Sequence, residues 1–356
     1  ISYAEALDTA RRIGQWLLRH QLSAQRPILV LSENDLEHAL LGLGAQFAGI
    51  PYAPVSVGSS LLSRDFEKLH HIVRTLTPGL VFAADGARYG RAIRAAIAAE
   101  VPVVVTENPL ADRDCTLFAD LAATAPTPEI DAARAATGAD TIAKFLFTSG
   151  STSLPKAVPN TQRMLCANQQ MHKQSVPQFV AEPLVLLDWL PWSHTMGGNN
   201  NMGLVLYNGG TLYLDDGKPT PQGMAETLRN LREIAPTAYL NVPRGYEALV
   251  VALRADAALR KTFFSRMRLF FYAGAGLSQP VWDALQEIAM QECRRPIPMF
   301  TGIGMTETAP SALFPTYLTD RAGLVGIPCP GVELKLVPDG VVRELVTRAK
   351  FRGRED

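Results

Sequence analysis

The stretch 145–159, F-L-F-T-S-G-S-T-S-L-P-K-A-V-P, holds residues whose types and spacing suit phosphate chemistry. The apolar run at 145–147 indicates a buried strand. Six small residues follow at 148–153, five of them with hydroxyl groups, and then come Pro155 and Lys156. Such a loop can turn its backbone N–H groups around an anion, while the hydroxyls and the lysine add donors and positive charge. We interpret it as a polyphosphate-binding loop; a Ser/Thr-rich surface turn is the alternative.

This loop is not the Walker A loop of GTPases and P-loop ATPases. That motif has the form G-x-x-x-x-G-K-[ST], with glycine before the lysine and a hydroxyl residue after it. Here Pro155 precedes Lys156 and Ala157 follows it. The sequence therefore disfavours the P-loop NTPase mechanism and leaves other nucleotide-binding classes open.

A second candidate segment runs from Asp188 to Asn201 and follows an apolar strand at 184–187. It combines aromatic residues, a lone histidine at His194, two glycines and three asparagines. In α/β proteins, ligands bind beyond the carboxyl ends of strands. We therefore expect ligand contacts here, although a hydrogen-bonded structural histidine accounts equally well for His194.

Two glycine-containing segments follow other apolar strands. The residues 274–276 (G-A-G) follow the strand 268–273, a pattern typical of nucleotide contacts or of tight packing between a strand and a helix. The residues 301–308 (T-G-I-G-M-T-E-T) place Thr306 beside Glu307. Glycines allow close approach of a ring or sugar, and a hydroxyl beside a carboxylate suits a Mg²⁺–phosphate site. A helix start capped by a threonine is the alternative for the second segment.

The composition restricts the class of protein. The sequence has 356 residues, of which 47% are hydrophobic and 19% charged, so a large folded core is expected. Lysine plus arginine and aspartate plus glutamate both total 34, which gives no support for nucleic-acid binding or electrostatic membrane attachment. The four scattered cysteines indicate a reducing compartment, and no apolar run is long enough to span a membrane. With no signal peptide in the sequence, we expect a cytoplasmic location.

Apolar strands alternate with amphipathic helices, which predicts an α/β protein with a mostly parallel sheet covered on both faces. Asp35 and Ser278 are expected to cap helices, and His70 and His71 to lie on a solvated helix face. The residues 119–139 are rich in Ala, Thr, Pro and Asp, and we expect a surface connection there. The predicted helices are 3–20, 35–48, 88–99, 162–175, 222–234 and 244–254, and the predicted strands are 28–31, 80–83, 101–105, 184–187, 211–214, 238–242, 268–273, 332–337 and 343–347.

With these segments placed, the chain resembles the adenylate-forming superfamily of acyl-CoA synthetases, nonribosomal-peptide adenylation domains and luciferases. Residues 147–156 are similar to the family signature T-S-G-[ST]-T-G-x-P-K, with Ser153 and Ala157 where glycine is usual. Residues 301–307 are similar to Y-G-x-T-E, with Ile303 in place of the adenine-stacking tyrosine.

Two further motifs of the family occur in the same order. Residues 273–276 match its adenine-side loop, and residues 326–331 match G-x-P-x-P-G, so that the resemblance covers residues 1–340. It implies the large N-terminal domain of adenylate-forming enzymes, with mostly parallel sheets sandwiched by helices and a small β-rich C-terminal portion. The implied AMP-binding large domain covers 1–331, and 332–356 would be its β-rich end approaching the hinge.

The family also has a small C-terminal domain with a catalytic lysine, and a T-G-D motif whose aspartate binds ribose. Neither is legible in this sequence, and we expect the small domain to be absent. A protein ending at Asp356 is therefore expected to bind ATP but to adenylate poorly.

The resemblance implies a role for each matching residue. The 148–156 loop would hold the β- and γ-phosphates of ATP, Thr306 the α-phosphate and Glu307 a Mg²⁺ ion. His194 would orient the substrate carboxylate and gate the entry of the thiol. The implied catalytic residues are His194, Lys156, Thr306 and Glu307. The implied ATP/AMP-binding residues are Thr148, Ser149, Gly150, Ser151, Thr152, Lys156, Gly274, Ala275, Gly276, Thr301, Gly302, Ile303, Gly304, Met305 and Thr306. The implied acyl-pocket residues are His194, Met196, Gly198, Asn241 and Val242.

The implied reaction activates a carboxylic acid with ATP as an acyl-adenylate, releases pyrophosphate and transfers the acyl group to CoA. ATP, Mg²⁺ and CoA are the expected small molecules; no nucleic-acid or membrane partner is expected, and a homodimer is left open. Residues 189–198 and 207–219 look most like feruloyl-CoA synthetases, so the expected acid is aromatic, such as ferulate. A carrier-protein-loading adenylation domain and an ATP-binding module without ligase activity are the alternatives.

Overall fold

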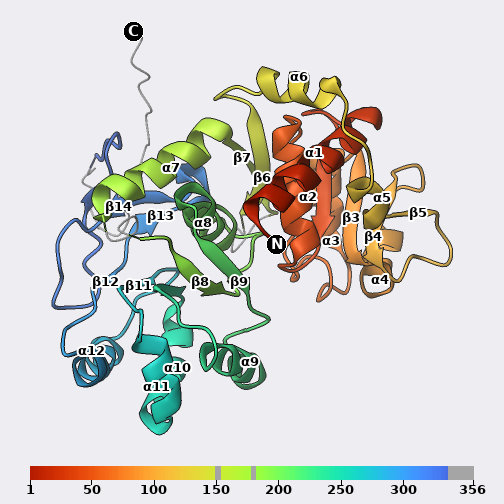
Figure 1. The fold of residues 1–356 in the computed structure, drawn as a ribbon. Coiled ribbons are helices and arrows are strands. Elements are labelled where there is room, and N and C mark those ends of the chain that lie inside the picture. The colour runs from red at the N-terminus through yellow and green to blue at the C-terminus, as the bar shows by residue number, and fades with distance from the viewer. Residues whose placement is uncertain (149–153, 178–181, 336–356) are drawn as a thin grey trace, which may run out of the picture. The chain divides into compact units, whose positions relative to one another are not determined.

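The computed structural model describes residues 1–148, 154–177 and 182–335 (Figure 1). The chain divides into two compact units. Unit 1 contains Ile1–Leu165 together with Pro191–His194, and unit 2 contains Cys166–Leu190 together with Thr195–Asp356. Each unit has its own sheets, helices and hydrophobic cores.

Unit 1 is built on a seven-stranded sheet with the order β5-β4-β3-β1-β2-β6-β7. All neighbours in this sheet pair in parallel except β6 and β7, which form an antiparallel pair. Short runs rich in Val, Ile, Leu and Phe form its centre because a parallel sheet is buried on both faces. Its strands are β1 (Ile28–Leu31), β2 (Tyr52–Pro54), β3 (Leu80–Asp85), β4 (Val103–Glu107), β5 (Cys115–Leu117), β6 (Ile142–Thr148) and β7 (Lys156–Thr161).

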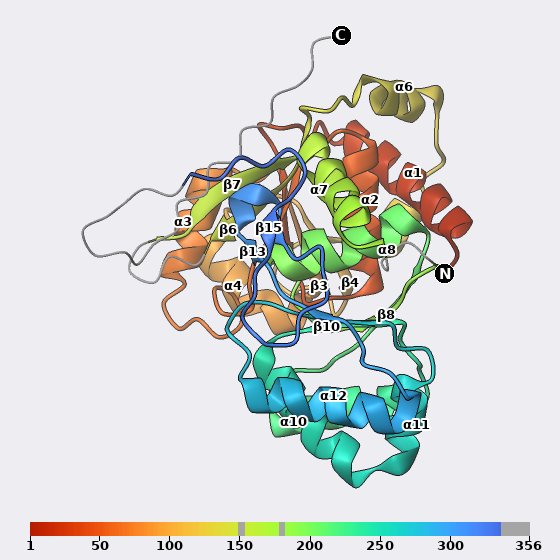
Figure 2. The ribbon, with the colours of Figure 1, turned by 90° about the vertical axis from the view of Figure 1, so that its left-hand side faces the viewer.

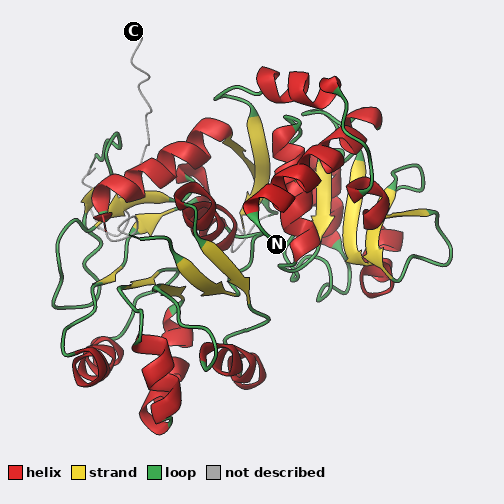
Figure 3. Cartoon of the chain, viewed as in Figure 1, coloured by secondary structure: helices red, strands yellow, loops and turns green. Residues whose placement is uncertain are grey.

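Helices cover both faces of this sheet (Figure 3). One core joins the sheet to α1, α2, α5 and α6, and the other joins it to α3 and α4. The start of α2 is fixed by Asp35, whose carboxylate accepts a hydrogen bond from the His38 backbone N–H at 2.6 Å, as the sequence predicted. The helices of unit 1 are α1 (Tyr3–Arg19), α2 (Leu36–Phe47), α3 (Glu67–Leu76), α4 (Gly86–Ala96), α5 (Phe118–Ala122) and α6 (Pro128–Ala136).

Unit 2 contains a parallel three-stranded sheet, β10-β11-β12, and a parallel pair, β8-β9. The β8 strand lies beside β10, since Thr237 N donates to the Val185 carbonyl at 3.0 Å. A third, antiparallel sheet has the order β13-β14-β15. These strands are β8 (Val185–Asp188), β9 (Thr211–Leu214), β10 (Ala238–Asn241), β11 (Leu269–Tyr272), β12 (Met299–Phe300), β13 (Ile303–Gly304), β14 (Ser311–Phe314) and β15 (Ile327–Pro328).

Two cores lie on opposite faces of the β10-β11-β12 sheet (Figure 2). Alternate strand residues point to each: Tyr239 and Phe270 to the helices α9 to α12, and Leu240 and Phe271 to α7 and α8. The helices are α7 (Gln162–Ser175), α8 (Met202–Asn208), α9 (Pro221–Leu231), α10 (Pro243–Ala255), α11 (Ala257–Phe264) and α12 (Gln279–Cys293), with a π-helix η2 (Met196–Asn201) and a 3₁₀ turn η3 (Thr306–Thr308).

The predicted elements up to β12 are found with shifts of a few residues, but several expectations are wrong. The residues 119–139 lie largely at the surface, as expected, but they are mostly helical, in α5 and α6, because the run of alanines favours a helix and Thr127-Pro128 starts one. Ser278 occupies the N-cap of α12 without a side-chain capping bond. Of the predicted strand 332–337, Leu334 is a single β-bridge residue and 336–337 lie outside the described residues, as does the predicted strand 343–347. His70 and His71, predicted to be solvated, are both half-buried.

The packing of α1 on α2 predicts a sensitive position at Gly44. A Cβ atom there would lie 2.7 Å from Ile13 Cγ2 and 3.0 Å from the Ala10 carbonyl. We expect Gly44→Ala to lower the free energy of unfolding by about 1–3 kcal/mol through overpacking. Gly138 has no atom within 4 Å of its added Cβ, so Gly138→Ala is the matched control and should change the free energy of unfolding by less than about 0.5 kcal/mol. Equal effects in urea denaturation would contradict this interpretation.

Candidate functional site

In unit 2, three of the predicted segments meet at one edge of a sheet. Asn241 pairs with Tyr272, and Phe271 with Phe300, so β10, β11 and β12 end together. The chain then leaves the strands as 241–242, 274–276 and 301–302. Ala273 N donates to the Asn241 carbonyl at 3.4 Å, which ties the first two segments together. Gly274 has φ +87°, a backbone conformation that favours glycine.

The glycines of the 301–308 segment have a structural reason. A Cβ on Gly302 would lie 2.5 Å from the Leu313 carbonyl, and one on Gly304 would collide with the Pro310 carbonyl. Both glycines therefore let β13 approach β14. The sequence predicts room for a ring or sugar at these glycines; the carbonyls of Leu313 and Pro310 give a sufficient structural reason for both.

The threonine and glutamate of this segment are presented by the turn η3. The turn is closed by Thr308, whose hydroxyl oxygen accepts a hydrogen bond from Met305 N at 3.0 Å. The capping threonine of the alternative interpretation is thus Thr308 and not Thr306. Glu307 is exposed and Thr306 is half-buried. A carboxylate beside a hydroxyl at an open turn can bind a cation that also binds phosphate oxygens.

The predicted acyl-pocket residues of unit 2 lie on two elements. Met196 and Gly198 are buried in the π-helix η2, a rare geometry that is frequent at functional sites. Asn241, at the end of β10, is 1% exposed, and its amide is engaged within the protein: it donates to Tyr239 Oη at 2.9 Å and accepts from Val242 N at 2.8 Å. Asn241 therefore shapes the strand end, whereas the neighbouring Val242 is half-buried.

A buried carboxyl group precedes the 189–194 stretch. Asp188, the last residue of β8, is 3% exposed, and its Oδ1 accepts from Leu190 N at 3.1 Å. Burial, with a further contribution from the charge of Asp215, raises the pKa of Asp188 to about 7. The sequence interpretation gave no role to this residue; a lone acidic residue at the end of an apolar strand was the available signal.

In unit 1, the β6–β7 hairpin carries the ends of the predicted phosphate loop. Thr148 and Lys156 face each other across the hairpin, and Lys156 is exposed. The loop residues Ser149, Gly150, Ser151 and Thr152 lie outside the described residues. The base of the loop is held by His71 of α3, whose Nε2 lies 2.9 Å from the Pro155 carbonyl. This contact corrects the expectation of a solvated His71.

His194 also belongs to unit 1, at the end of the short segment 191–194. This segment is fixed by its neighbour Trp192, whose backbone N–H donates to Asn34 Oδ1 at 3.0 Å. The Trp192 ring meets the buried His38 ring edge-on, with centroids 5.1 Å apart. His194 is exposed, yet desolvation by the surrounding protein lowers the pKa of its imidazole below the ordinary value. The ring is therefore neutral near pH 7 and can donate or accept a hydrogen bond.

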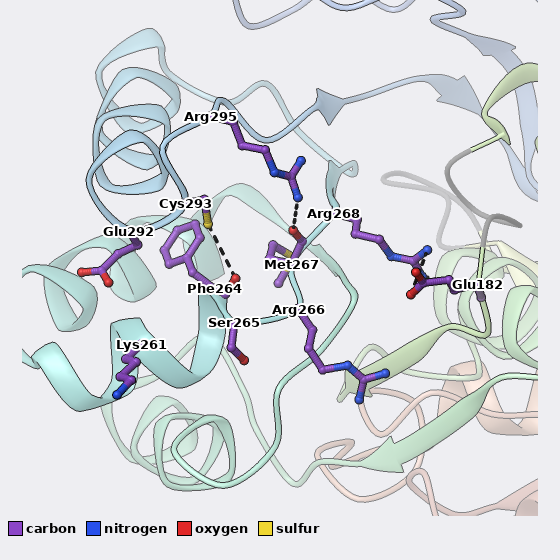
Figure 4. Close-up of a pocket in the computed structure, with 10 residues that line it drawn as sticks. All are labelled: Glu182, Lys261, Phe264, Ser265, Arg266, Met267, Arg268, Glu292, Cys293 and Arg295. Carbon is purple, nitrogen blue, oxygen red and sulfur yellow. Dashed lines mark hydrogen bonds and ion pairs between the residues drawn. The ribbon is translucent and has the colours of Figure 1, made fainter.

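The pocket shown in Figure 4 lies within unit 2, at the opposite strand ends from residues 241–242, 274–276 and 301–302. Its volume is about 550 Å³, and residues such as Met267, Arg268 and Arg295 line it just ahead of the strands β11 and β12. It is therefore at the amino ends of the strands. Arg295 donates to the Met267 carbonyl at 3.2 Å, close to the C-terminal ends of α11 and α12. Positively charged side chains stabilise the C-terminal ends of helices, which accounts for the arginines in this pocket without a ligand.

A magnesium ion fits the Thr306-Glu307 turn by the chemistry of its donors. Among residues 1–148, 154–177 and 182–335, no group of three or more His, Cys, Asp or Glu side chains could hold a metal. Mg²⁺ in phosphate-transfer sites uses one or two carboxylates and completes its shell with phosphate oxygens and water. A single exposed carboxylate at Glu307 suits that mode and excludes an all-protein metal cage in this part of the chain.

The AMP-binding enzyme family matches residues 1–348, and the chain belongs to this family. A 4-hydroxybenzoate–CoA/benzoate–CoA ligase of Rhodopseudomonas palustris is 27% identical over 351 residues, which cover 95% of this chain and 59% of that protein. A 3-hydroxybenzoate–CoA ligase of Aromatoleum sp. is 25% identical over 345 residues, which cover 95% of this chain and 60% of that protein. The chain thus spans about three fifths of the length of these curated relatives.

A solved structure supports the same assignment. The benzoate CoA ligase of Burkholderia xenovorans LB400 matches with a TM-score of 0.75 and 25% identity, over 96% of this chain and 64% of that one. The predicted superfamily and the predicted α/β fold of its large N-terminal domain are confirmed. Within the part of the chain that is described, no helix is long and apolar enough to cross a membrane.

The buried carboxyl group predicts a pH-dependent stability. The pKa of Asp188 is about 7 in the folded protein and near the ordinary aspartate value of 3.8 when the chain is unfolded. Between these values the folded state binds more protons, so the free energy of unfolding falls as pH rises, by up to about 1.4 kcal/mol per pH unit. We expect Asp188→Asn to flatten this slope between about pH 4 and pH 7 in urea denaturation. An unchanged slope would show that the carboxyl group titrates normally.

Proposed function

We propose that the protein is an acid–CoA ligase that activates a carboxylic acid with ATP and then forms the CoA thioester. The observation that carries this proposal is its membership of the AMP-binding enzyme family, with aromatic-acid CoA ligases similar over 95% of the chain. Within that class we propose an aromatic acid as substrate, and ferulate in particular from the resemblance of residues 189–198 and 207–219. A cytoplasmic location is part of the same proposal.

The first step requires charge screening. A carboxylate oxygen attacks the α-phosphorus of ATP, a bond forms between them, and the bond from that phosphorus to the bridging oxygen breaks with release of pyrophosphate. Both partners are anionic, so the protein must neutralise charge and hold the attack in line. We propose that Lys156, with the hydroxyls of the loop that starts at Thr148, holds the departing pyrophosphate. Thr306 binds the α-phosphate, and Glu307 would hold Mg²⁺, which supplies further positive charge when bound.

The second step is acyl transfer. The sulfur of CoA attacks the carbonyl carbon of the acyl-adenylate, AMP leaves, and the thiol proton passes to solvent. We propose that His194 orients the substrate carboxylate and that Met196, Gly198 and Val242 border the acyl group. The segments 274–276 and 301–305 would border the adenine, with Ile303 giving apolar contact where a stacking ring is usual in the family.

The substrate is tested by a panel of acids. The complete natural protein is assayed for ATP-dependent hydroxamate formation with ferulate, benzoate, hydroxybenzoates and aliphatic acids. Ferulate should be among the best substrates. If benzoates or aliphatic acids are the best substrates, ferulate is rejected as the substrate and the assignment as a ligase stands. If ATP binds but no adenylate forms with any acid, a nucleotide-binding module is favoured. Thioester formation with free CoA separates the ligase from a domain that loads a carrier protein.

The proposed Mg²⁺ ligand gives a mutational test. Glu307→Gln should lower acid-dependent pyrophosphate exchange by about 100-fold, because the neutral amide binds Mg²⁺ poorly while the fold of the turn is kept. Glu287, on α12 and only 3.8 Å from Arg254 in an exposed ion pair, offers the control Glu287→Gln, which should leave exchange unchanged. Normal exchange in Glu307→Gln, at limiting Mg²⁺, would remove Glu307 from the site.

A further inference from the structure

Helix α7 has polar side chains on the face that it buries in unit 2. Asn168, Gln169 and His172 are 1%, 3% and 1% exposed. A buried amide or imidazole costs free energy unless it makes hydrogen bonds, so the contacts of these groups show what the helix holds in place. Those contacts reach two different segments, the chain at the end of η3 and the π-helix η2.

Asn168 holds the chain at the end of the η3 turn and just after it. Its Nδ2 donates to the Thr308 carbonyl at 3.2 Å and to the Ser311 carbonyl at 3.1 Å. Its Oδ1 accepts from Ser311 N at 3.4 Å. One side chain thus clamps the segment that follows Thr306 and Glu307, from a position 140 residues earlier in the sequence.

His172 holds the same segment one helical turn further on. Its Nε2 lies 2.7 Å from Ser311 Oγ, and its ring lies against Phe314 with centroids 5.3 Å apart. Burial lowers the pKa of His172 to about 4, so the ring stays neutral near pH 7. Asn168 and His172 therefore fix the start of β14, and with it the end of the η3 turn.

Gln169 points to the other predicted substrate segment. Its Nε2 donates to the Asn199 carbonyl at 3.0 Å, within the π-helix η2 that holds Met196 and Gly198. A Cβ on Gly203, at the start of α8, would collide with this amide, so glycine there gives Gln169 its space. Figures 1 and 2 show α7 alongside α8 and the sheet that contains β13.

We propose that α7 is a positioning helix with two separable outputs: Asn168 and His172 set the Thr306-Glu307 turn for the nucleotide, and Gln169 sets η2 for the acyl substrate. None of the three is a catalytic residue. The inference rests on the proposed function, because it assigns a substrate to each segment. Adjacent residues on one helix then control the binding of different substrates.

The test compares near-isosteric variants that remove one amide each: Asn168→Leu and Gln169→Met. The control is Gln286→Met. Gln286 is also a buried amide that forms hydrogen bonds with the main chain, since it donates to the carbonyl of Ile297 and accepts from its N–H, just before β12. In the complete natural protein, KM for ATP and for the best acid, kcat and thermal midpoint are measured, with Mg²⁺–ATP affinity by calorimetry. Asn168→Ser, which keeps one donor, replaces Asn168→Leu if that variant does not fold.

We expect Asn168→Leu to raise the KM and the dissociation constant for ATP by about tenfold, while the KM for the acid changes by less than about twofold. We expect Gln169→Met to raise the KM for the acid by about tenfold, while the KM for ATP changes by less than about twofold. The control Gln286→Met should lower the thermal midpoint and leave both KM values unchanged. His172→Gln, whose amide reaches the place of Nε2, should recover ATP affinity lost in His172→Leu. Parallel changes in both KM values, or changes no larger than those of Gln286→Met, would overturn the proposal. If no acid is activated by the wild type, the proposed function fails, and the ATP calorimetry alone still decides the role of Asn168.

Discussion

The parallel pairing of β10, β11 and β12 is the constraint on which the candidate site of unit 2 depends. Because these strands run in one direction and in register, the chain must leave all three at the same edge. The segments that begin at Asn241, Ala273 and Thr301 are neighbours for that reason and not through contacts with one another alone. In the aromatic core beneath, the Phe263 ring contacts both Tyr239 of β10 and Phe270 of β11, which helps to hold these strands in register.

Much of the fold could be predicted from the sequence because its signals are local. Apolar runs such as Ile28–Leu31 and Leu269–Tyr272 are strands, and Asp35 caps a helix, as short-range patterns indicate. The candidate site was only partly predictable. Gly302 and Gly304 could be identified as positions of close approach, but the carbonyls that crowd them belong to Leu313 and Pro310, which only the folded chain brings near.

The α7 contacts show more clearly what sequence reasoning misses. In the sequence, an Asn such as Asn168 only interrupts the apolar face of an amphipathic helix. Its hydrogen-bond partners lie 140 and 143 residues away, so no local pattern reveals them. The alanine-rich residues of α6 were missed for the opposite reason: local helix propensity outweighs a composition typical of loops. Long-range polar partners and short solvent-facing helices are therefore the features that only the structure supplies.

The π-helix η2 also has an evolutionary consequence. A π-turn holds one residue more than an α-turn, so η2 is equivalent to a single-residue insertion at the start of α8. Loss or gain of one residue within Met196–Asn201 would rotate the side chains of this segment while the helix after it continues. A related chain can thus acquire a differently shaped surface here by a change of length alone, without rebuilding the strands that support it.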